Sequence, residues 1–346
     1  MIRTATKHSS GKSTVQILAV VLLVAAAWSA SAWYMQRSAP ATGPLEQVTI
    51  ATNTEYVGSC PVIVAQEKGY FAQHGVAAII QKHSSGKSAL EAALSGKAQL
   101  ATTADIPIMF AAMKNVPVTI IATIFKTEKD HGIVGRRDSG IGAPASLKGK
   151  RIGVTLSTSG HFVLDAFLNR QRLSERDVTV RNLRPDEFAG ALARGEVDAI
   201  ATWEPFLGAL LAQLDGNGTV FYGEDIYEIP YNIAGARDYV ERHPELMKKV
   251  LRALLQGVDY CRTDPEAASA VMATALKVDT TKWKQNWPTY RFKLALDQSL
   301  LLTLEDESRW AVANGLAEGK TTPNFLNYVY LDALQAVAPS AVTVIH

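Results

Sequence analysis

Hydroxyl side chains gather at three places in this sequence where a short apolar run is followed by an expected helix. They are Ser59, Ser84-Ser85 and Ser157-Thr158-Ser159. The N-terminus of a helix offers backbone N–H groups without an intrahelical acceptor, together with the positive end of the helix dipole. Three such ends facing one cleft would bind a small oxyanion without many charged side chains. Because serine and threonine are also favoured helix caps, each hydroxyl taken alone has a purely structural explanation as well.

Acidic and aromatic residues at other strand ends are further candidates. Asp105 and Glu204 each lie beside a proline at the end of an apolar run, and a carboxylate there suits a ligand with a cationic or hydrogen-bond-donating part. Trp203 either closes over an apolar part of the ligand or packs in the core. The same two interpretations apply to three aromatic residues of loops and crossovers, Tyr56, Phe125 and Tyr231. His161, in the first turn of an expected helix, either contacts the ligand or serves in capping and packing.

Motifs of other chemistries are incomplete. The run from His83 to Ser88 ends like a phosphate-binding P-loop, but Gln81 stands where the first glycine of that motif belongs. The seven histidines show no paired spacing of metal ligands, and no G-x-S-x-G motif of a serine hydrolase occurs. We therefore expect neither a metal nor a cofactor, and a binding protein rather than an enzyme.

Two stretches of the chain, 76–107 and 177–205, have the same order of features. Each begins with a short apolar strand and continues with a helix that contains Ala-Leu near its end and is followed by a glycine, Gly96 or Gly195. A second strand follows in each and ends at an acid near a proline. An internal repeat fixes architecture, and this one indicates two similar βαβ lobes. Two similar lobes imply a cleft between them.

Alternating strands and helices around the repeats predict parallel sheets with helices on both faces. Val48–Thr52 opens one lobe and Arg151–Thr155 opens the other. His131–Arg137 is expected to be extended, and Tyr231–Ala236 is the strand expected to return to the first lobe. We therefore predict a first lobe of residues 46–138 and 230–346, with residues 139–229 inserted as the second. Ligands of open α/β sheets bind at the carboxyl ends of the strands, where the hydroxyl clusters lie.

The N-terminus differs from the rest of the chain. Basic residues precede a charge-free run from Ser13 to Gln36, whose apolar part spans residues 15–33. That part is about long enough to cross a bilayer, and Ala30-Ser31-Ala32 offers small residues for a signal peptidase. Residues 1–45 are therefore a cleaved signal peptide or a retained inner-membrane anchor, followed by a linker. In both cases the globular part is exported to the periplasm.

Composition limits the class of partner. The chain is 47% hydrophobic and 20% charged, which is typical of a globular protein long enough for about two domains. The first 45 residues hold four basic residues and no acid, so the remainder is close to neutral, which argues against a nucleic-acid partner. Cys60 and Cys261 can form at most one bridge. A body of this length can bury enough core without a disulfide, so we expect none, although the sequence leaves both states open.

Five stretches, in their order and spacing, carry a family likeness. They are VIVAQEKGYFAQHGV (62–76), SGKSALEAALSGKAQLATTADIP (85–107), SLKGKRIGV (146–154), STSGHFVLDAFL (157–168) and LRPDEFAGALARGEVDAIATWEPF (183–206). Over about residues 46–260 the chain resembles the periplasmic substrate-binding proteins of nitrate-, sulfonate- and taurine-type ABC importers. The resemblance implies a two-lobed, type II-like periplasmic binding protein of the α/β class. Its cleft would capture a small solute, and its partners would be a membrane permease and the ATPase subunit of that permease.

The resemblance also implies which loops hold the ligand. They are Asn53–Ser59, Ser84–Ser85, Ala104–Asp105, Ser157–His161 and Trp203–Glu204. Relatives take nitrate, alkanesulfonates, taurine, aromatic acids or pyrimidine vitamin precursors, so the solute stays open. The loops hold no arginine or lysine apart from Lys87 just inside a helix. With Asp105 and Glu204 present, we expect an aminosulfonate or a neutral heterocycle rather than a bare, strongly charged ion.

Two other functions remain open. The first is a thiamine-pyrimidine-synthase-like enzyme on the same fold, against which the export segment argues. The second is a membrane-tethered ligand sensor, which would need a separate signalling partner. For the binding protein itself we expect a monomer.

Overall fold

The computed structural model describes residues 43–224, 226–277, 283, 286–317 and 321–345. The predicted signal peptide or anchor, including residues 15–33 and the cleavage region, lies outside the described residues. In the described part of the chain, no helix combines the length and apolar character needed to cross a membrane. Gly43–His346 forms one compact unit by itself.

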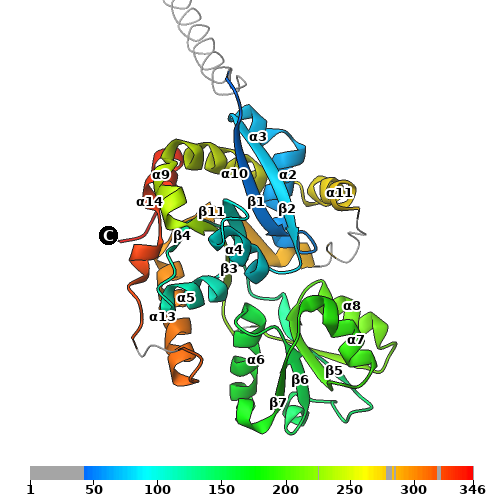
Figure 1. The fold of residues 1–346 in the computed structure, drawn as a ribbon. Helices are drawn as coiled ribbons and strands as arrows, with labels where there is room; N and C mark the ends of the chain where they lie inside the picture. The colour runs from blue at the N-terminus through cyan, green and yellow to red at the C-terminus, as the bar shows by residue number, and fades with distance from the viewer. Residues whose placement is uncertain (1–42, 225, 278–282, 284–285, 318–320, 346) are drawn as a thin grey trace, which may run out of the picture. The chain divides into compact units, whose positions relative to one another are not determined.

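The first sheet has six strands in the order β11-β4-β10-β3-β1-β2 (Figure 1). Their bounds are β1 Glu46–Asn53, β2 Val76–His83, β3 Leu100–Ala104, β4 Val118–Thr127, β10 Ile229–Ala236 and β11 Tyr290–Ala295. Strand β1 pairs in parallel with β2 and β3, whereas β10 runs antiparallel to β3 and β4. The position of β10 is that expected for the strand that returns to the first lobe.

The second sheet has five strands in the order β7-β6-β8-β5-β9. Their bounds are β5 His131–Arg136, β6 Arg151–Val154, β7 Thr179–Asn182, β8 Ala199–Trp203 and β9 Gly218–Tyr222. The order β5-β8-β6-β7 repeats the order β10-β3-β1-β2 of the first sheet, with the same parallel and antiparallel pairings. The internal repeat predicted from sequence is thus confirmed, and Gly96 and Gly195 end the equivalent helices with φ of 76° and 66°.

Two expectations need correction. The sheets are mixed rather than parallel, because β5 and β10 enter from the other lobe instead of following a helical crossover, and they pair antiparallel to their neighbours. The first crossover also lies earlier than residue 138. Strand β5 pairs with β8 and β9, and its adjacent residues Ile133 and Val134 are buried in cores on opposite faces of the second sheet. The segment His131–Arg136 therefore belongs to the second sheet.

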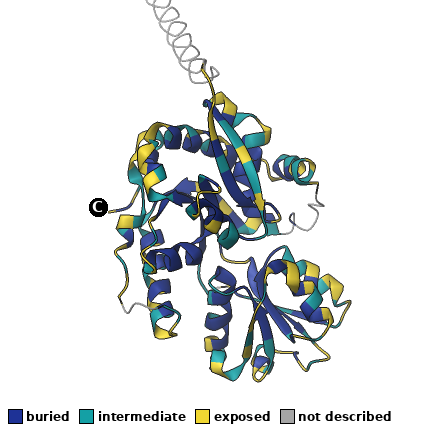
Figure 2. Ribbon diagram, in the orientation of Figure 1, coloured by how far each residue is buried: buried dark blue, intermediate teal, exposed yellow. Residues whose placement is uncertain are grey.

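Helices cover both faces of the sheets (Figure 1). In chain order they are α2 Cys60–Glu67, α3 Tyr70–Gln73, α4 Gly86–Leu94, α5 Asp105–Met113, α6 Ser159–Arg170, α7 Phe188–Ala193, α8 Phe206–Gln213, α9 Arg237–Arg242, α10 Pro244–Thr263, α11 Pro265–Leu276, α13 Gln298–Ala313 and α14 Leu331–Val337. Figure 2 shows the buried residues concentrated in the strands and on the sheet-facing sides of the helices. Helix α10 illustrates why: Pro244 stands in its first turn, and apolar residues recur at helical spacing along one face, Leu246, Val250, Leu254 and Val258 among them.

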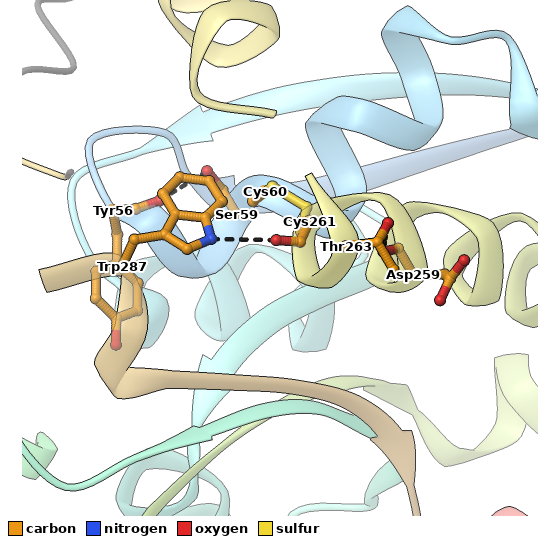
Figure 3. Close-up of a disulfide and its surroundings, with 7 residues drawn as sticks. All are labelled: Tyr56, Ser59, Cys60, Asp259, Cys261, Thr263 and Trp287. Atoms are coloured by element: carbon orange, nitrogen blue, oxygen red, sulfur yellow. Dashed lines mark hydrogen bonds between the residues drawn. A yellow bond between two sulfur atoms is a disulfide. The ribbon is translucent and has the colours of Figure 1, made fainter. Parts of the chain in front are cut away.

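A disulfide joins Cys60, at the start of α2, to Cys261, near the end of α10 (Figure 3). The expectation of two free cysteines was therefore wrong. The two helices approach closely because Gly257, one turn before Cys261, has no side chain: a Cβ atom there would lie 2.2 Å from the carbonyl oxygen of Pro61. Trp287 Nε1 donates a hydrogen bond of 3.1 Å to the Cys261 carbonyl beside the bridge. Sequence alone cannot reveal a contact between residues 201 positions apart.

Candidate functional site

Strand ends and helix N-termini of both sheets line one cavity. The space between the lining atoms, including the part open to solvent, is about 380 Å³. The lining residues that end strands of the first sheet, follow them or begin its helices are Asn53, Tyr56, Ser85, Gly86, Lys87, Thr103, Ala104 and Pro107. The others come from the second sheet, helix α6 or the returning strand: His131, Thr158, Ser159, Trp203, Ile229 and Tyr231. The site thus lies at the carboxyl ends of the strands, as the fold favours.

Half of the predicted ligand residues lie in this cavity. They are Tyr56, Ser85, Thr158, Ser159, Trp203 and Tyr231. Ser85 caps α4, with its side chain accepting a hydrogen bond of 3.1 Å from the Ser88 N–H. Thr158 precedes α6, and Ser159 is the first residue of that helix. Two helix N-termini, one from each sheet, therefore face the same cavity and offer N–H donors to an anionic group.

The other six predicted residues do not line the cavity. They are Ser59, Ser84, Asp105, Ser157, His161 and Glu204. The hydroxyl of Ser59 donates a 2.8 Å bond to the Tyr56 carbonyl, so this residue fixes the loop that carries Tyr56. Glu204 accepts bonds from the Gly208 N–H and the Tyr222 hydroxyl.

Two more of these six take part in contacts outside the cavity. Nε2 of His161 lies 2.7 Å from the Glu175 carboxylate, and its ring packs on Trp310. Ser157 adopts a φ of 60° and faces a separate hollow between α4 and α5. Phe125, which is fully buried, packs among Tyr56, Tyr231 and Tyr290 and does not reach the cavity.

A buried polar chain that was not predicted from the sequence includes Asp130, at the crossover into β5, and His131, the first residue of that strand. Ser159 Oγ lies 2.7 Å from His131 Nε2, and His131 Nδ1 lies 2.5 Å from Asp130 Oδ1. Asp130 is 0% exposed and His131 is 4% exposed. An adjacent acid and histidine at the start of an extended segment was the available signal. Its meaning depends on the sheet to which the segment belongs, because Ser159 lies beside His131 only when β5 is part of the second sheet.

Two tyrosines of the first sheet hold the other oxygen of Asp130. Tyr56 and Tyr290 both donate to Asp130 Oδ2, the latter at 3.3 Å. Burial, reinforced by the neighbouring Asp130 carboxylate, raises the pKa of both tyrosine hydroxyls well above their usual range, so both stay protonated donors. Asp130 is therefore bound to the first sheet by its side chain, while the next residue, His131, begins a strand of the second.

Lys87 is the cationic side chain of the cavity lining. It stands in the first turn of α4, and its Nζ donates a hydrogen bond of 3.0 Å to the carbonyl of Leu156, just after β6. This bond joins a helix packed on the first sheet to a loop of the second. Trp203, 6% exposed, forms an adjoining wall, with its ring centroid 6.0 Å from that of His131.

Asp105 lies behind the cavity lining and is buried with Glu307 of α13. Burial raises the pKa of Asp105 to about 6. Burial, together with the Asp105 carboxyl, raises the pKa of Glu307 well above its usual range. Two carboxyls cannot both ionise cheaply in such a place, so at least one keeps its proton at neutral pH. Asp105 is therefore a buried acid behind the site, and it does not line the cavity.

Glu307→Gln should raise the stability of the protein above pH 6. Because the folded-state pKa of the pair exceeds the unfolded value, the free energy of unfolding falls as the pH rises from about 4 through 6 and beyond. The amide cannot ionise, so Asp105 can become charged beside a hydrogen-bond donor. We expect the free energy of unfolding to increase by about 2 kcal/mol at pH 8 and to change little at pH 4, as measured by urea unfolding across pH.

Glu305→Gln is the control for this prediction, because Glu305 lies on the same helix but is partly exposed. Parallel curves for wild type and Glu307→Gln would refute the interpretation.

Comparison with known proteins agrees with this architecture. The family model described as NMT1/THI5 like matches residues 57–268. The taurine-binding periplasmic protein of Escherichia coli is 27% identical over 63% of this chain and 68% of its own length. A 4-amino-5-hydroxymethyl-2-methylpyrimidine phosphate synthase of Aspergillus parasiticus is 27% identical over 64% of this chain and 69% of its own length.

Solved structures establish the fold. The alkanesulfonate-binding protein SsuA from Xanthomonas axonopodis pv. citri, bound to MOPS, superimposes with a TM-score of 0.74 at 22% identity. The match covers 84% of this chain and 100% of that protein. The described part of the chain thus has the two-lobed α/β fold of periplasmic binding proteins. With the family model matching more than half of its length, the chain belongs to the NMT1/THI5-like family.

Proposed function

We propose that this protein is the solute-binding component of an ABC importer and captures a small organic anion, with a sulfonate as the leading class. The observation that carries the proposal is the cavity where the N-termini of α4 and α6, Lys87 and the Ser159 hydroxyl converge. These groups are cationic or donate hydrogen bonds. A sulfonate or carboxylate oxygen accepts hydrogen bonds from such groups. The relatives named for taurine and alkanesulfonates support the same class of ligand.

The cavity does not provide the carboxylates from which a cationic part of the ligand was predicted. That prediction rested on Asp105 and Glu204, and neither carboxylate lines the cavity. The lining contributes Lys87 as a cation and Trp203, Tyr56 and Tyr231 as aromatic walls. An anionic head group at the helix ends and a short apolar body against Trp203 would fit this distribution.

The same proposal assigns the lobes, the location and the partners. Residues 43–129 and 229–345 would form one lobe, and residues 131–228 the other, with hinges at the two crossovers. Closure of the lobes on the ligand would present a surface to a membrane permease driven by its ATPase subunit. We propose that the protein acts as a monomer in the periplasm, delivered there by its N-terminal segment.

Trp203→Ala should weaken ligand binding at least about tenfold, because it removes an apolar wall and admits water to the polar contacts. The full chain would first be screened by thermal shift against taurine, methanesulfonate, isethionate and nitrate, and the best probe titrated by calorimetry. Tyr222→Phe is the matched control: it removes a hydrogen bond to the adjacent Glu204 without altering the lining, and should stay within twofold of wild type. Unchanged affinity in Trp203→Ala would place the ligand elsewhere, and no binding of any probe would overturn the proposed class.

An enzymatic function is the second candidate, favoured by one specific observation. Ser159, His131 and Asp130 have the order and distances of a hydroxyl nucleophile, its general base and an orienting acid. Intact mass spectrometry after treatment with a fluorophosphonate distinguishes the classes. An adduct on Ser159 would favour acyl transfer, a covalently held cofactor would favour a synthase, and an unmodified chain supports the binding protein that we propose.

A further inference from the structure

Hydrogen-bond directions in the chain from Asp130 to Ser159 are restricted by its donors. Both tyrosine hydroxyls donate to one oxygen of Asp130, and the other oxygen faces His131 Nδ1. A carboxylate is an acceptor at both oxygens, so Nδ1 must carry a proton to complete the contact. The remaining ring nitrogen, Nε2, is then the only atom of His131 whose proton can vary. It faces Ser159 Oγ at 2.7 Å.

The two charge states of His131 give Ser159 opposite properties. When His131 is neutral, Nε2 accepts the Ser159 proton, and the hydroxyl can offer only lone pairs to a ligand. When His131 is protonated, Nε2–H donates to Ser159, and the hydroxyl proton is free to point into the cavity. A ligand oxygen that needs a donor therefore favours the protonated histidine. A ligand N–H favours the neutral one.

The charges around the cavity act in the same direction. With His131 neutral, Asp130 and Lys87 balance, and an anionic ligand leaves one uncompensated negative charge in a buried place. Protonation of His131 restores the balance, and burial of an unpaired charge is costly. The other titratable groups near His131 and Asp130 are four buried tyrosines, two buried carboxyls behind the cavity and the acid that follows β8: Tyr56, Tyr227, Tyr231, Tyr290, Asp105, Glu307 and Glu204. All of these are acids, so none opposes a positive charge at His131.

We propose that an anionic ligand is captured together with one proton, which binds His131 and turns the Ser159 hydroxyl from an acceptor into a donor. The proposal rests on the proposed function, because it concerns an anion in the same cavity. It makes His131 a specificity-determining residue: acceptor head groups such as sulfonates bind with a proton, and donor head groups such as ammonium or amide bind without one. Histidine is suited to this role because its charge can change near neutral pH.

Methanesulfonate is the probe for the test, because its charge is constant from pH 5 to 9. Calorimetric titration of the full chain at pH 8.5, in buffers of different ionisation enthalpy, gives the number of protons taken up on binding. We expect a value approaching one, and an affinity that falls up to tenfold per pH unit on the alkaline side. His131→Gln keeps a donor toward Ser159 but cannot titrate, so its proton uptake should be zero and its affinity independent of pH. His243→Gln changes a histidine that does not line the cavity, and this variant should retain the wild-type coupling.

The outcomes separate this proposal from the proposed function. Binding without proton uptake, and with equal affinity from pH 6 to 9, overturns the proton coupling and leaves the binding function standing. Failure of every anionic probe to bind refutes the function. In that case the ligand-free protein still decides the geometry by long-range ¹H–¹⁵N NMR of its histidines. Neutral His131 protonated on Nδ1 agrees with the proposal, and neutral His131 protonated on Nε2 contradicts it.

Discussion

Removing the Cys60–Cys261 bridge should lower the free energy of unfolding by about 5 kcal/mol, the largest effect that we expect from any pair of substitutions. The bridge closes a loop of 201 residues, and the chain-entropy account of disulfides gives roughly this value for a loop of that length. The melting temperature should fall by about 10 °C in a protein of this size. Urea unfolding of the double variant Cys60→Ala/Cys261→Ala under oxidising conditions provides the measurement.

Reduction and single substitution supply the controls. Cys60→Ala alone also lacks the bridge, so it should match the double variant to within the small cost of one buried sulfur atom. Wild type treated with a reductant should approach the same stability. A double variant within about 1 kcal/mol of oxidised wild type would show that the bridge adds little to the stability of the fold.

Asp130→Ala should cost about 3–5 kcal/mol of stability and abolish detectable ligand binding. The substitution leaves three buried donors, Tyr56, Tyr290 and His131, without their acceptor, and breaking a buried charged pair has a cost of this order. It also frees His131 to rotate or change tautomer, so Ser159 is no longer held at the cavity. Urea unfolding and calorimetry on the same preparation separate the two losses.

Two variants make this result specific. Asp138→Ala removes an exposed carboxylate paired with Arg136 a few residues along the same segment, and exposed pairs add little to stability. It should leave both stability and binding near wild type. Asp130→Asn keeps the size of the side chain but introduces a donor, so we expect most of the binding defect with a smaller loss of stability. Normal binding in Asp130→Asn would remove Asp130 from the site.

The parts of the fold that follow from local pattern were predictable. The two βαβ repeats, the glycines that end their helices and the return strand all depend on short-range periodicity and backbone conformation. The direction of β5 and the sheet to which it belongs were not predictable from its own residues. Ile133 and Val134 make both faces of the strand apolar, so it could pack in either sheet. The Cys60–Cys261 contact was inaccessible for a related reason: it depends on the packing of α2 on α10, which Gly257 permits.

Some residues of the candidate site were predictable from the sequence, and others were not. Ser85, Thr158 and Ser159, predicted from helix starts after strands, line the cavity because the fold topology brings strand ends together. Asp105 and Glu204, predicted from their position in the repeat, do not line the cavity. Repeat position cannot distinguish a side chain that enters the cavity from one that turns toward a buried neighbour or its own helix. His131 and Asp130 required knowledge of the crossover, because their partners lie on α6, on the loop after β1 and on β11.

The disulfide has a topological consequence for the second sheet. Every residue from β5 to β9, and both crossovers, lie between Cys60 and Cys261 along the chain, so the bridge encloses the whole inserted segment. A single proteolytic cut anywhere in that segment would leave two fragments tied to each other by one covalent bond. On a gel the nicked molecule would migrate as an intact chain until a reductant is added. The disulfide thus keeps both ends of the inserted segment covalently joined to the first sheet even after that segment has been cleaved.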